Sequence, residues 1–281
     1  MKQEAILEYY MVNGRLYPTA DVRFFDEIDP KSIYEVIRII DGVPLYLEAH
    51  LERMRKSAHI LGFQIHKSDQ EIVSELVQLV EANGCPNLNV KLLCSHLQSS
   101  SQTFLLCFIE SHYPEREVYG RGIDTILFHS ERENPNAKVV NVGLRERIQE
   151  EIKKKGAFEA ILVNDEGYIT EGSRSNIFFV RGDMVYTAPA GEVLLGVTRT
   201  RIMEVCKALG IGVIEQPIPV KDLAGMEGAF MTGTSVNVLP IASIDQQKFD
   251  SVNHPIIEKI ARGYENDMEA YRASSKVRAK C

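Results

Sequence analysis

The first 110 residues show two kinds of hydrophobic pattern. In residues 48–62 apolar side chains recur at helical spacing, which predicts a helix. A second helix is expected from Ser68 or Asp69 to near Gly84. Runs rich in aliphatic residues predict strands around these helices, and the first two runs flank the hairpin dipeptide Asp41-Gly42. The expected strands cover residues 32–40, 43–47, 89–94 and 103–110.

Beyond a polar stretch at residues 111–122, which holds one proline and two glycines, short apolar runs dominate. A helix is expected over residues 198–210, and Pro255 is suited to the first turn of a last helix towards Ala273. Residues 274–281 show no periodic pattern and are expected to fray. The expected strands cover residues 123–129, 158–164, 168–170, 176–180 and 184–188, with further apolar runs at 212–220 and 228–244.

This order predicts an α+β chain of two unequal domains. With 281 residues the chain exceeds the usual size of a single hydrophobic core. We expect a small N-terminal α/β domain over 1–113, an interdomain linker over 114–122 and a larger C-terminal domain over 123–281. The second domain is rich in strands that curl or pack on one another.

Composition and charge narrow the classes of function. With 44% hydrophobic and 25% charged residues, the chain is typical of a soluble globular protein. Its net charge of -7 argues against nucleic acid and acidic membranes as partners, because both require clustered Lys and Arg. The acidic N-terminus lacks the apolar core of a signal peptide, and no run reaches the roughly 18 apolar residues of a membrane span. Five scattered cysteines without metal-ligand spacing suggest reduced thiols, so we expect a cytoplasmic protein and no metal site.

One lysine stands out in the stretch NPNAKVVNVG, residues 134–143. Lys138 lies among small and β-branched residues, whereas Lys153–Lys155 belong to an expected solvated helix face. A desolvated lysine is costly unless it is paired or used. It can hold a free amine near neutral pH and attack a carbonyl to form a Schiff base. The alternative is a strand lysine whose amine reaches water, and the residues alone leave both interpretations open.

Three further stretches carry groups that suit an acid or an anion site. Glu171 ends an apolar strand and precedes the small polar run Gly172–Asn176. Residues 196–198 open a helix with glycine, valine and threonine, whose free N–H groups suit an anion. Residues 231–237, MTGTSVN, form a turn of small hydroxyl residues after an apolar strand. Each has a plain structural alternative, a turn residue or an ordinary helix cap. Together with a Schiff-base lysine they match what pyridoxal 5′-phosphate requires.

The chain resembles the class IV pyridoxal-phosphate aminotransferases, the fold type IV family of branched-chain and D-amino acid transaminases and aminodeoxychorismate lyase. The resemblance runs from about Glu8 to Asp245. Its most specific parts are YEVIRIIDG, HLERM, GAFEAILVNDEGYITEGSRSNIFFV, LLGVTRTRI and TGTSVNVLPI. Lys138 stands 18 positions before the Gly156 that opens GAFEAIL, which matches the spacing of the family's Schiff-base lysine. The resemblance implies that the larger domain is a cofactor-binding pseudo-barrel.

The resemblance also implies a role for each matching residue. Lys138 would be the Schiff-base lysine and would carry a proton between the substrate Cα and the cofactor C4′. Glu171 would keep the pyridine nitrogen protonated, and Arg53 would bind the phosphate with its forked donors. Further cofactor contacts would come from Leu194, Val197, Thr198 and Thr234, and substrate contacts from Tyr34, His96, Gly233, Thr234 and Ser235.

Three departures from the family pattern bear on the substrate. Pro30-Lys31-Ser32 stands where the family often has Gly-Asp-Gly, so the loop from Asp29 to Ser32 is expected to differ in shape. His96 stands where many D-amino acid transaminases and lyases carry an arginine, and it is charged only at lower pH. Val36 stands where the lyase pattern often has threonine. His96 disfavours the D-amino acid interpretation, and Val36 disfavours the lyase interpretation.

The sequence therefore predicts a pyridoxal-phosphate transaminase that moves an amino group from an amino acid to a 2-oxo acid. A branched-chain-like donor is favoured. The alternatives within the family are D-amino acid transamination and the aminodeoxychorismate lyase reaction. An alternative of another class is a binding protein on this fold that has lost catalysis. The resemblance also implies a homodimer.

Overall fold

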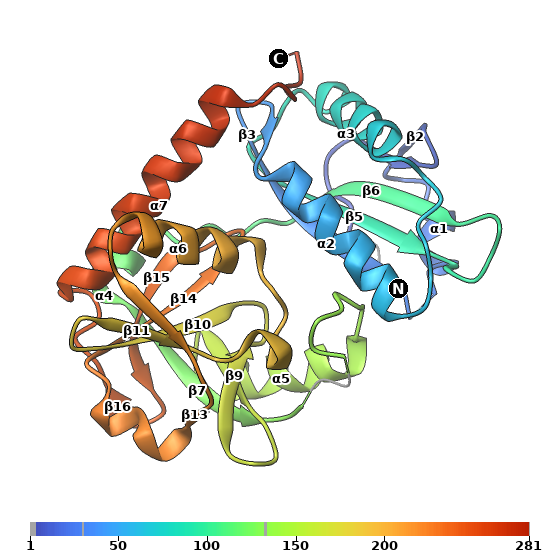
Figure 1. The fold of residues 1–281 in the computed structure, drawn as a ribbon. Coiled ribbons are helices and arrows are strands. Elements are labelled where there is room, and N and C mark those ends of the chain that lie inside the picture. The colour runs from blue at the N-terminus through green and yellow to red at the C-terminus, as the bar shows by residue number, and fades with distance from the viewer. Residues whose placement is uncertain (1–3, 30, 132–133, 281) are drawn as a thin grey trace. The chain divides into compact units, whose positions relative to one another are not determined.

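The structure is a computed structural model that describes residues 4–29, 31–131 and 134–280 (Figure 1). Its internal contacts divide the chain into two compact units. The first unit comprises Met1–His112, Ala137–Asn141 and Met268–Cys281, and the second comprises Tyr113–Asn136 and Val142–Asp267. The five residues around Lys138 therefore pack with the N-terminal unit. Pro30, part of the loop expected to be atypical, lies outside the described residues.

The first unit contains a six-stranded antiparallel sheet in the order β2-β1-β6-β5-β3-β4. Its strands are β1 (Tyr9–Val12), β2 (Arg15–Pro18), β3 (Ile33–Ile40), β4 (Val43–Pro44), β5 (Asn89–Ser95) and β6 (Thr103–Ile109), and its helices are α1 (Arg23–Asp26), α2 (Leu47–Ile60) and α3 (Asp69–Ala82). The strand predicted over residues 43–47 is wrong beyond Pro44. Tyr46 has a φ of 51°, outside the extended region, and α2 begins at the next residue.

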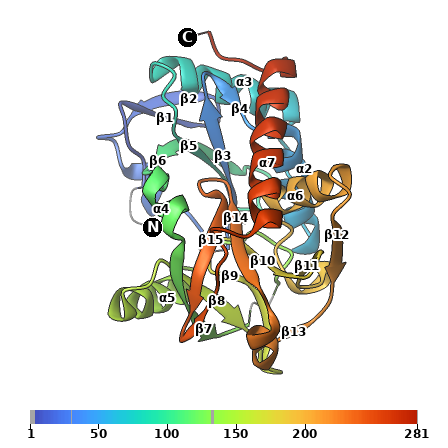
Figure 2. The same cartoon turned by 90° about the vertical axis from the view of Figure 1, so that its left-hand side faces the viewer.

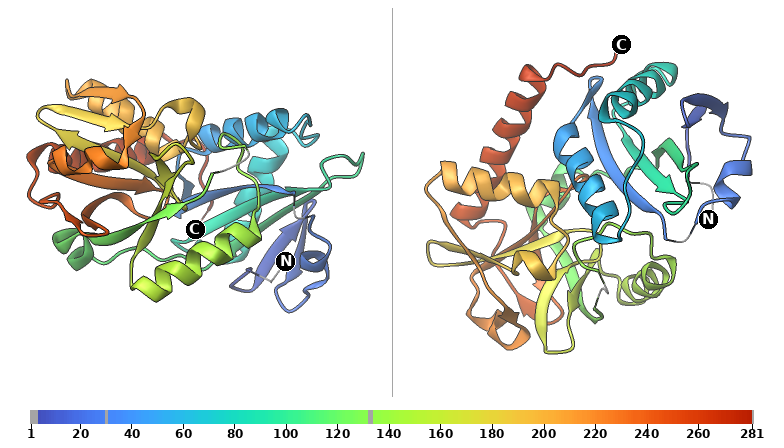
Figure 3. Two further views of the ribbon diagram at one scale, coloured as in Figure 1. Left: turned by 90° about the horizontal axis from the view of Figure 1, so that it is seen from below. Right: turned by 45° about the vertical axis from the view of Figure 1, so that its right-hand side comes forward.

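Helices α2 and α3 cover one face of this sheet (Figure 1; Figure 3). Leu51 of α2 and Leu76 of α3 share a buried cluster with alternate residues of β3, among them Ile37 and Ile39. Both predicted helices are confirmed. Ser68 caps α3 through a reciprocal bond with Glu71, the capping box that fixes the first turn of a helix.

The C-terminal residues of the chain are held on the first unit. The Ala279 N–H donates to the carbonyl of Gly42 at 2.9 Å, and Ala279 is only 3% exposed. The Lys280 N–H donates to the Glu81 carboxylate at 2.7 Å. The expectation that residues 274–281 fray is therefore wrong for this part of the tail, because a backbone contact far away in the sequence secures it.

The second unit is built on a ten-stranded sheet in the order β12-β11-β10-β14-β15-β7-β8-β9-β13, with β16 paired to β15 (Figure 2). β9 and β10 lie far apart in this order yet contact each other, so the sheet curls back on itself. The strands are β7 (Ile123–His129), β8 (Glu159–Val163), β9 (Tyr168–Gly172), β10 (Asn176–Arg181), β11 (Met184–Thr187), β12 (Gly212–Glu215), β13 (Ile218–Pro219), β14 (Gly228–Gly233), β15 (Asn237–Ile244) and β16 (Gln247–Lys248).

The helices of the second half of the chain include the two predicted ones. α6 begins at residue 197 and α7 at Pro255, which confirms both helix predictions. The polar segment expected as a linker contains α4. The helices are α4 (Arg116–Arg121), α5 (Val142–Lys155), α6 (Val197–Ala208) and α7 (Pro255–Ser274), with short 3-10 turns at Ala190–Glu192 and Val220–Gly225.

Within the described residues, none of the helices combines the length and the apolar character that crossing a bilayer requires. The prediction of reduced thiols is confirmed for Cys94, Cys107 and Cys206, which are buried and free. It is wrong for Cys85, which is disulfide-bonded. Sequence spacing does not reveal which cysteines the fold brings within bonding distance. Cys281 lies outside the described residues.

Candidate active site

The residues predicted as site residues occur in both units. The first unit contributes Tyr34, Arg53, His96 and Lys138, and the second contributes Glu171, Leu194, Val197, Thr198, Gly233, Thr234 and Ser235. Within each unit, contacts between segments that lie far apart in the sequence bring several of these residues together.

The Lys138 segment lies beside the beginning of β3 and is joined to it by an isolated β-bridge. Val139 forms an antiparallel bridge with Ile33. The Tyr34 N–H donates to the Lys138 carbonyl at 3.1 Å, and the Val140 N–H donates to the Ser32 carbonyl at 3.0 Å. The Lys138 backbone is thus fixed to the strand that carries Tyr34.

The Lys138 amine lies over the aromatic ring of Tyr34. Its Nζ is 4.7 Å from the ring centroid, a distance at which the negative face of the ring attracts a cation. A second amine, that of Lys91, is 5.2 Å from the same ring. Lys91 is 4% exposed and forms an ion pair with Glu4. Lys91 was not predicted as a site residue. Its position inside the apolar run of β5 could have indicated that this lysine is buried.

Arg53 is held by a buried carboxylate. Its Nε donates to Glu35 Oε1 at 2.7 Å and its Nη2 donates to Glu35 Oε2 at 2.5 Å. His50 Nδ1 bonds the same carboxylate at 2.8 Å. Glu35 and His50 were not predicted from the sequence, since strand and helix periodicity alone do not reveal which polar groups face each other.

The protonation of this cluster follows from its burial. Burial raises the pKa of Glu35, but the charge and hydrogen bonds of Arg53 and the hydrogen bond of His50 outweigh it and lower that pKa to about 2. Burial lowers the pKa of His50 more than the hydrogen bond to Glu35 raises it. Glu35 is therefore ionised and His50 neutral near neutral pH, and the cluster presents Arg53 in one fixed orientation.

His96 follows the last residue of β5. Its φ is 55°, in the left-handed region, and the imidazole is half-buried. Its Nδ1 bonds the Thr103 hydroxyl on β6 at 3.2 Å. That bond ties one ring nitrogen of His96 to the neighbouring strand.

In the second unit, Glu171 is buried at the end of β9, 3% exposed. Its Oε2 accepts the Leu194 N–H at 3.2 Å. The Asn176 side-chain amide at the start of β10 donates to the Leu194 carbonyl at 2.8 Å. Both backbone groups of Leu194 are thus fixed by the two strands that flank the polar run.

The beginning of α6 has no side-chain cap. Gly196 is its N-cap and provides no side-chain cap, so the first helical N–H groups at Val197 and Thr198 have no capping oxygen from it. A Cβ at Gly196 would lie 2.2 Å from Asn176 Oδ1, which excludes any larger residue without rearrangement. A glycine is therefore required for the strand and the helix to meet.

Gly233 ends β14, and Thr234 and Ser235 belong to the turn that leads to β15. The Val236 N–H donates to the Gly233 carbonyl at 3.2 Å, and Asn237 has a φ of 51°, so the chain reverses tightly. Thr232 precedes this turn and pairs with Asn176 across the strands. Because Asn176 also contacts Leu194 and the N-cap of α6, this turn, Glu171 and the start of α6 gather at one end of the sheet.

A buried carboxylate also supports the Glu171 run. Glu159 is 2% exposed and accepts the Ser173 hydroxyl at 2.5 Å and the Ser175 hydroxyl at 3.2 Å. The Gly172 N–H donates to the Ser175 carbonyl at 2.8 Å. These bonds fix the turn that follows Glu171. Glu159 was not predicted as a supporting residue.

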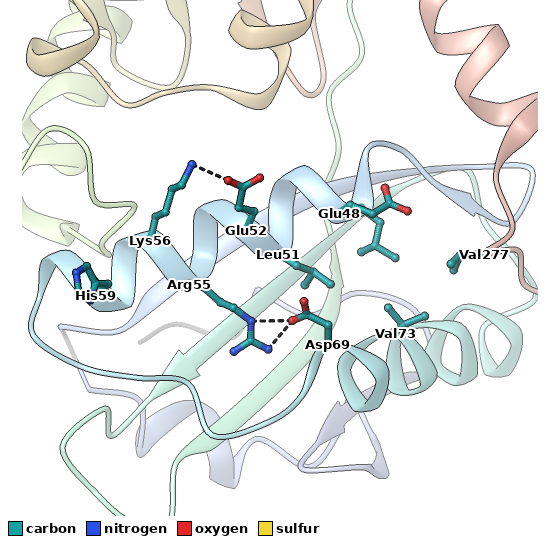
Figure 4. Close-up of a pocket in the computed structure, with 10 residues that line it drawn as sticks. Glu48, Leu51, Glu52, Arg55, Lys56, His59, Asp69, Val73 and Val277 are labelled. Carbon is teal, nitrogen blue, oxygen red and sulfur yellow. Dashed lines mark hydrogen bonds and ion pairs between the residues drawn. The ribbon is translucent and has the colours of Figure 1, made fainter.

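A pocket of about 500 Å³ opens elsewhere on the first unit (Figure 4). Leu51, Val73 and Val277 are among the apolar side chains that line it, and Arg55 forms an ion pair with Asp69 beside them. None of the predicted site residues lines this pocket. No cluster of three or more metal-ligating side chains occurs in the part of the chain that the structure describes.

Comparison with known proteins identifies the family to which the chain is similar. The sequence profile of the family described as Amino-transferase class IV matches residues 32–244. A D-alanine aminotransferase from Bacillus licheniformis is 26% identical over 262 residues, which cover 84% of this chain and 87% of that protein. A probable branched-chain-amino-acid aminotransferase from Rickettsia felis is 28% identical over 293 residues, which cover 94% of this chain and 97% of that protein.

A solved structure confirms the predicted fold class. The T.th. branched-chain amino acid aminotransferase, determined with pyridoxamine 5′-phosphate, matches with a TM-score of 0.84 at 24% identity, covering 95% of each chain. The fold is thus the two-domain α+β fold of the fold type IV enzymes. Because the family profile matches most of its length, the chain belongs to the class IV amino-transferase family and is a pyridoxal-phosphate-dependent aminotransferase.

Proposed function

We propose that this chain binds pyridoxal 5′-phosphate through the predicted site residues and that Lys138 is the reactive amine. The observation that carries this proposal is the fixed backbone of Lys138, whose carbonyl and N–H are both bonded while its amine lies over Tyr34. A reactive lysine needs such a placement, because its amine has to meet a carbonyl at a defined position.

The donor set fits this cofactor. Glu171 supplies a buried carboxylate suited to a pyridinium nitrogen, and the uncapped beginning of α6 suits a phosphate. The hydroxyl of Thr232, adjacent to the turn at Gly233, is buried and has no hydrogen-bond partner among the described residues. A buried hydroxyl without a partner is costly, so an additional acceptor nearby would stabilise it.

When bound, pyridoxal phosphate withdraws electrons from the substrate Cα, and the protein directs that chemistry. In our proposal Lys138 accepts the Cα proton and returns it at the cofactor C4′. Glu171 keeps the proton on the pyridine nitrogen. Arg53, Val197, Thr198 and Thr234 bind the phosphate, and Leu194 packs on the face of the ring.

The phosphate role of Arg53 gives a prediction that separates cofactor binding from folding. Arg53→Ala should raise the cofactor dissociation constant at least about tenfold, because a hydrogen bond to a charged group contributes ~1.5–3 kcal/mol. The variant should also lose about 3–5 kcal/mol of unfolding free energy, since the Glu35 carboxylate is left buried without its countercharge. Equilibrium dialysis and thermal unfolding measure the two effects.

A double variant provides the control for Arg53. Arg53→Ala/Glu35→Gln removes both charges, so it should regain much of the stability but not the cofactor affinity. If the double variant binds pyridoxal phosphate as tightly as the wild-type protein, Arg53 is not a phosphate ligand.

We propose an amino donor with a branched-chain-like side chain. The Rickettsia felis relative named as a branched-chain-amino-acid aminotransferase supports this choice, and the Bacillus licheniformis D-alanine aminotransferase supports the D-amino acid alternative. The N–H and hydroxyl groups of residues 233–235 are proposed to bind the donor carboxylate, and Tyr34 lines the pocket. Aminodeoxychorismate lyase chemistry is the third alternative within the family.

His96 distinguishes the L- from the D-amino acid proposal. Its Nδ1 is bonded to Thr103, and residues 233–235 already offer donors, so we propose a peripheral role. A donor panel with 2-oxoglutarate and pyruvate as acceptors should show L-donors outperforming D-donors. His96→Ala should change the Michaelis constant of the best donor only about two- to fivefold, less than the tenfold that 1.4 kcal/mol represents. Activity confined to D-alanine or D-glutamate and abolished in His96→Ala would establish the D-amino acid alternative.

We also propose that the protein is cytoplasmic and that it is a homodimer, the latter as the family resemblance implies. A catalytically inactive binding protein on this fold is the alternative of another class. It would bind pyridoxal phosphate and yet transfer no amino group from any donor in the panel. The presence of Lys138, Glu171, Arg53 and Thr198 together argues against it, because loss of function would free the lysine to change.

A further inference from the structure

Ser57 is a buried serine of α2 whose hydroxyl joins two segments of the first unit. Its Oγ donates to the Arg53 carbonyl, one helical turn earlier, at 3.0 Å. The same oxygen accepts the Lys138 N–H at 3.1 Å. Ser57 is 0% exposed, so these two bonds are shielded from water.

The first bond alone would be ordinary, because serines within helices often donate to the carbonyl four residues earlier. The second bond is not explained by helix geometry. On the side facing β3, Lys138 and Val140 exchange bonds with Tyr34 and Ser32, and this leaves the Lys138 N–H directed at the helix. A backbone N–H in such surroundings needs an acceptor, and the serine hydroxyl supplies it.

The two bonds connect the reactive lysine to the turn that carries Arg53. Arg53 is in turn fixed by Glu35, which follows Tyr34 on β3. Lys138 is therefore held from two directions, by β3 through its carbonyl and by α2 through its N–H. Removal of the Ser57 hydroxyl would remove this hydrogen bond from α2 and keep the hydrogen bond to β3.

We propose that Ser57 is a positioning residue for Lys138 and that it sets where the lysine amine stands relative to the reacting atoms. This inference rests on the proposed role of Lys138. Ser57 is expected to affect the rate at which Lys138 transfers a proton. Binding of the phosphate is expected to depend on Arg53, which Glu35 holds in place.

Ser57→Ala should lower kcat by about 10- to 100-fold, because displacing a reacting group by about 1 Å can cost 10²-fold. The Michaelis constant of the donor and the dissociation constant of pyridoxal phosphate should change by less than about threefold. Ser57 bonds only the backbone of Arg53 and Lys138 in these two hydrogen bonds, not the side chains proposed to bind the donor and the phosphate. Ser57→Thr keeps a hydroxyl that can bond the carbonyl four residues earlier, and it should recover part of kcat.

A measurement independent of activity is the hydrogen exchange of the Lys138 amide in the full-length protein with pyridoxal phosphate bound. It should be protected in the wild type and exchange at least about tenfold faster in Ser57→Ala, while peptides of α3 are unchanged. Ser251→Ala is a matched control. Ser251 is also 0% exposed, donates to a backbone carbonyl at 2.6 Å and accepts a backbone N–H at 2.9 Å, but on strands of the second unit.

Faster exchange at Lys138 together with the fall in kcat, in Ser57→Ala and not in Ser251→Ala, supports the proposal. Unchanged exchange at Lys138, or equal losses of kcat in both variants, overturns it. These outcomes are separate from the role of Lys138 itself. If Lys138→Ala keeps its activity, the proposed function fails, whatever the exchange rates in Ser57→Ala are.

Discussion

Lys138→Ala should lower the rate of transamination by ~10³-fold or more, because one side chain both anchors the cofactor and carries the proton. The substitution removes the amine that lies over Tyr34 but leaves the two backbone bonds of residue 138 in place. The fold should therefore survive, and the loss should appear in kcat measured at saturating pyridoxal phosphate. Purified wild-type protein should be yellow and the variant should lack the absorption band of lysine-bound cofactor.

A surface lysine provides the control for this result. Lys154 lies on α5 with its side chain 72% exposed, and Lys154→Ala should keep the wild-type rate and spectrum. A Lys138→Ala protein that still transaminates within about tenfold of the wild type would show that another group performs the proton transfer.

Glu171→Gln should keep cofactor binding and lower kcat by about 10²-fold, the usual scale of an acid–base group. The amide oxygen of glutamine can still accept the Leu194 N–H, which the Glu171 carboxylate accepts at 3.2 Å, so the local structure should be retained. A neutral amide cannot keep the pyridine nitrogen protonated, and electron withdrawal from the substrate is weakened as a result. Pre-steady-state absorbance of the bound cofactor locates the slowed step.

The matched control for Glu171 is an exposed glutamate of the same unit. Glu166 is exposed in the turn before β9, and Glu166→Gln should not change kcat. If Glu171→Gln turns over as fast as the wild type, Glu171 serves only to end its strand and to bond Leu194.

The local elements of the fold could be predicted because their signals lie within a few residues. Ser68 and Glu71, three residues apart, indicate the start of α3, and Pro255 does the same for α7. The strand expected over residues 43–47 stops at Pro44 because Tyr46 leaves the extended region, a local conformation that hydrophobic pattern does not encode. The order of strands in the two sheets was out of reach, since pairing joins segments more than a hundred residues apart, such as β7 and β15.

The residues of the candidate site also fall into those that the sequence could predict and those that it could not. Lys138, Glu171 and Arg53 could be singled out by residue type, position and family resemblance. Their supporting groups could not, because these contacts depend on tertiary structure. Glu35 meets Arg53 across a strand and a helix, and Ser57 meets Lys138 over 81 positions of sequence. No periodic pattern in the sequence indicates either of these two contacts.

The most direct test of the account is to reduce the wild-type protein with borohydride after loading it with pyridoxal phosphate and to map the modified peptide by mass spectrometry. Reduction makes the bond between the cofactor and its lysine permanent, so the modified residue identifies the reactive amine. The account predicts one stoichiometric modification, on Lys138. Modification at another lysine such as Lys91, or a colourless protein that takes up no cofactor, would contradict it.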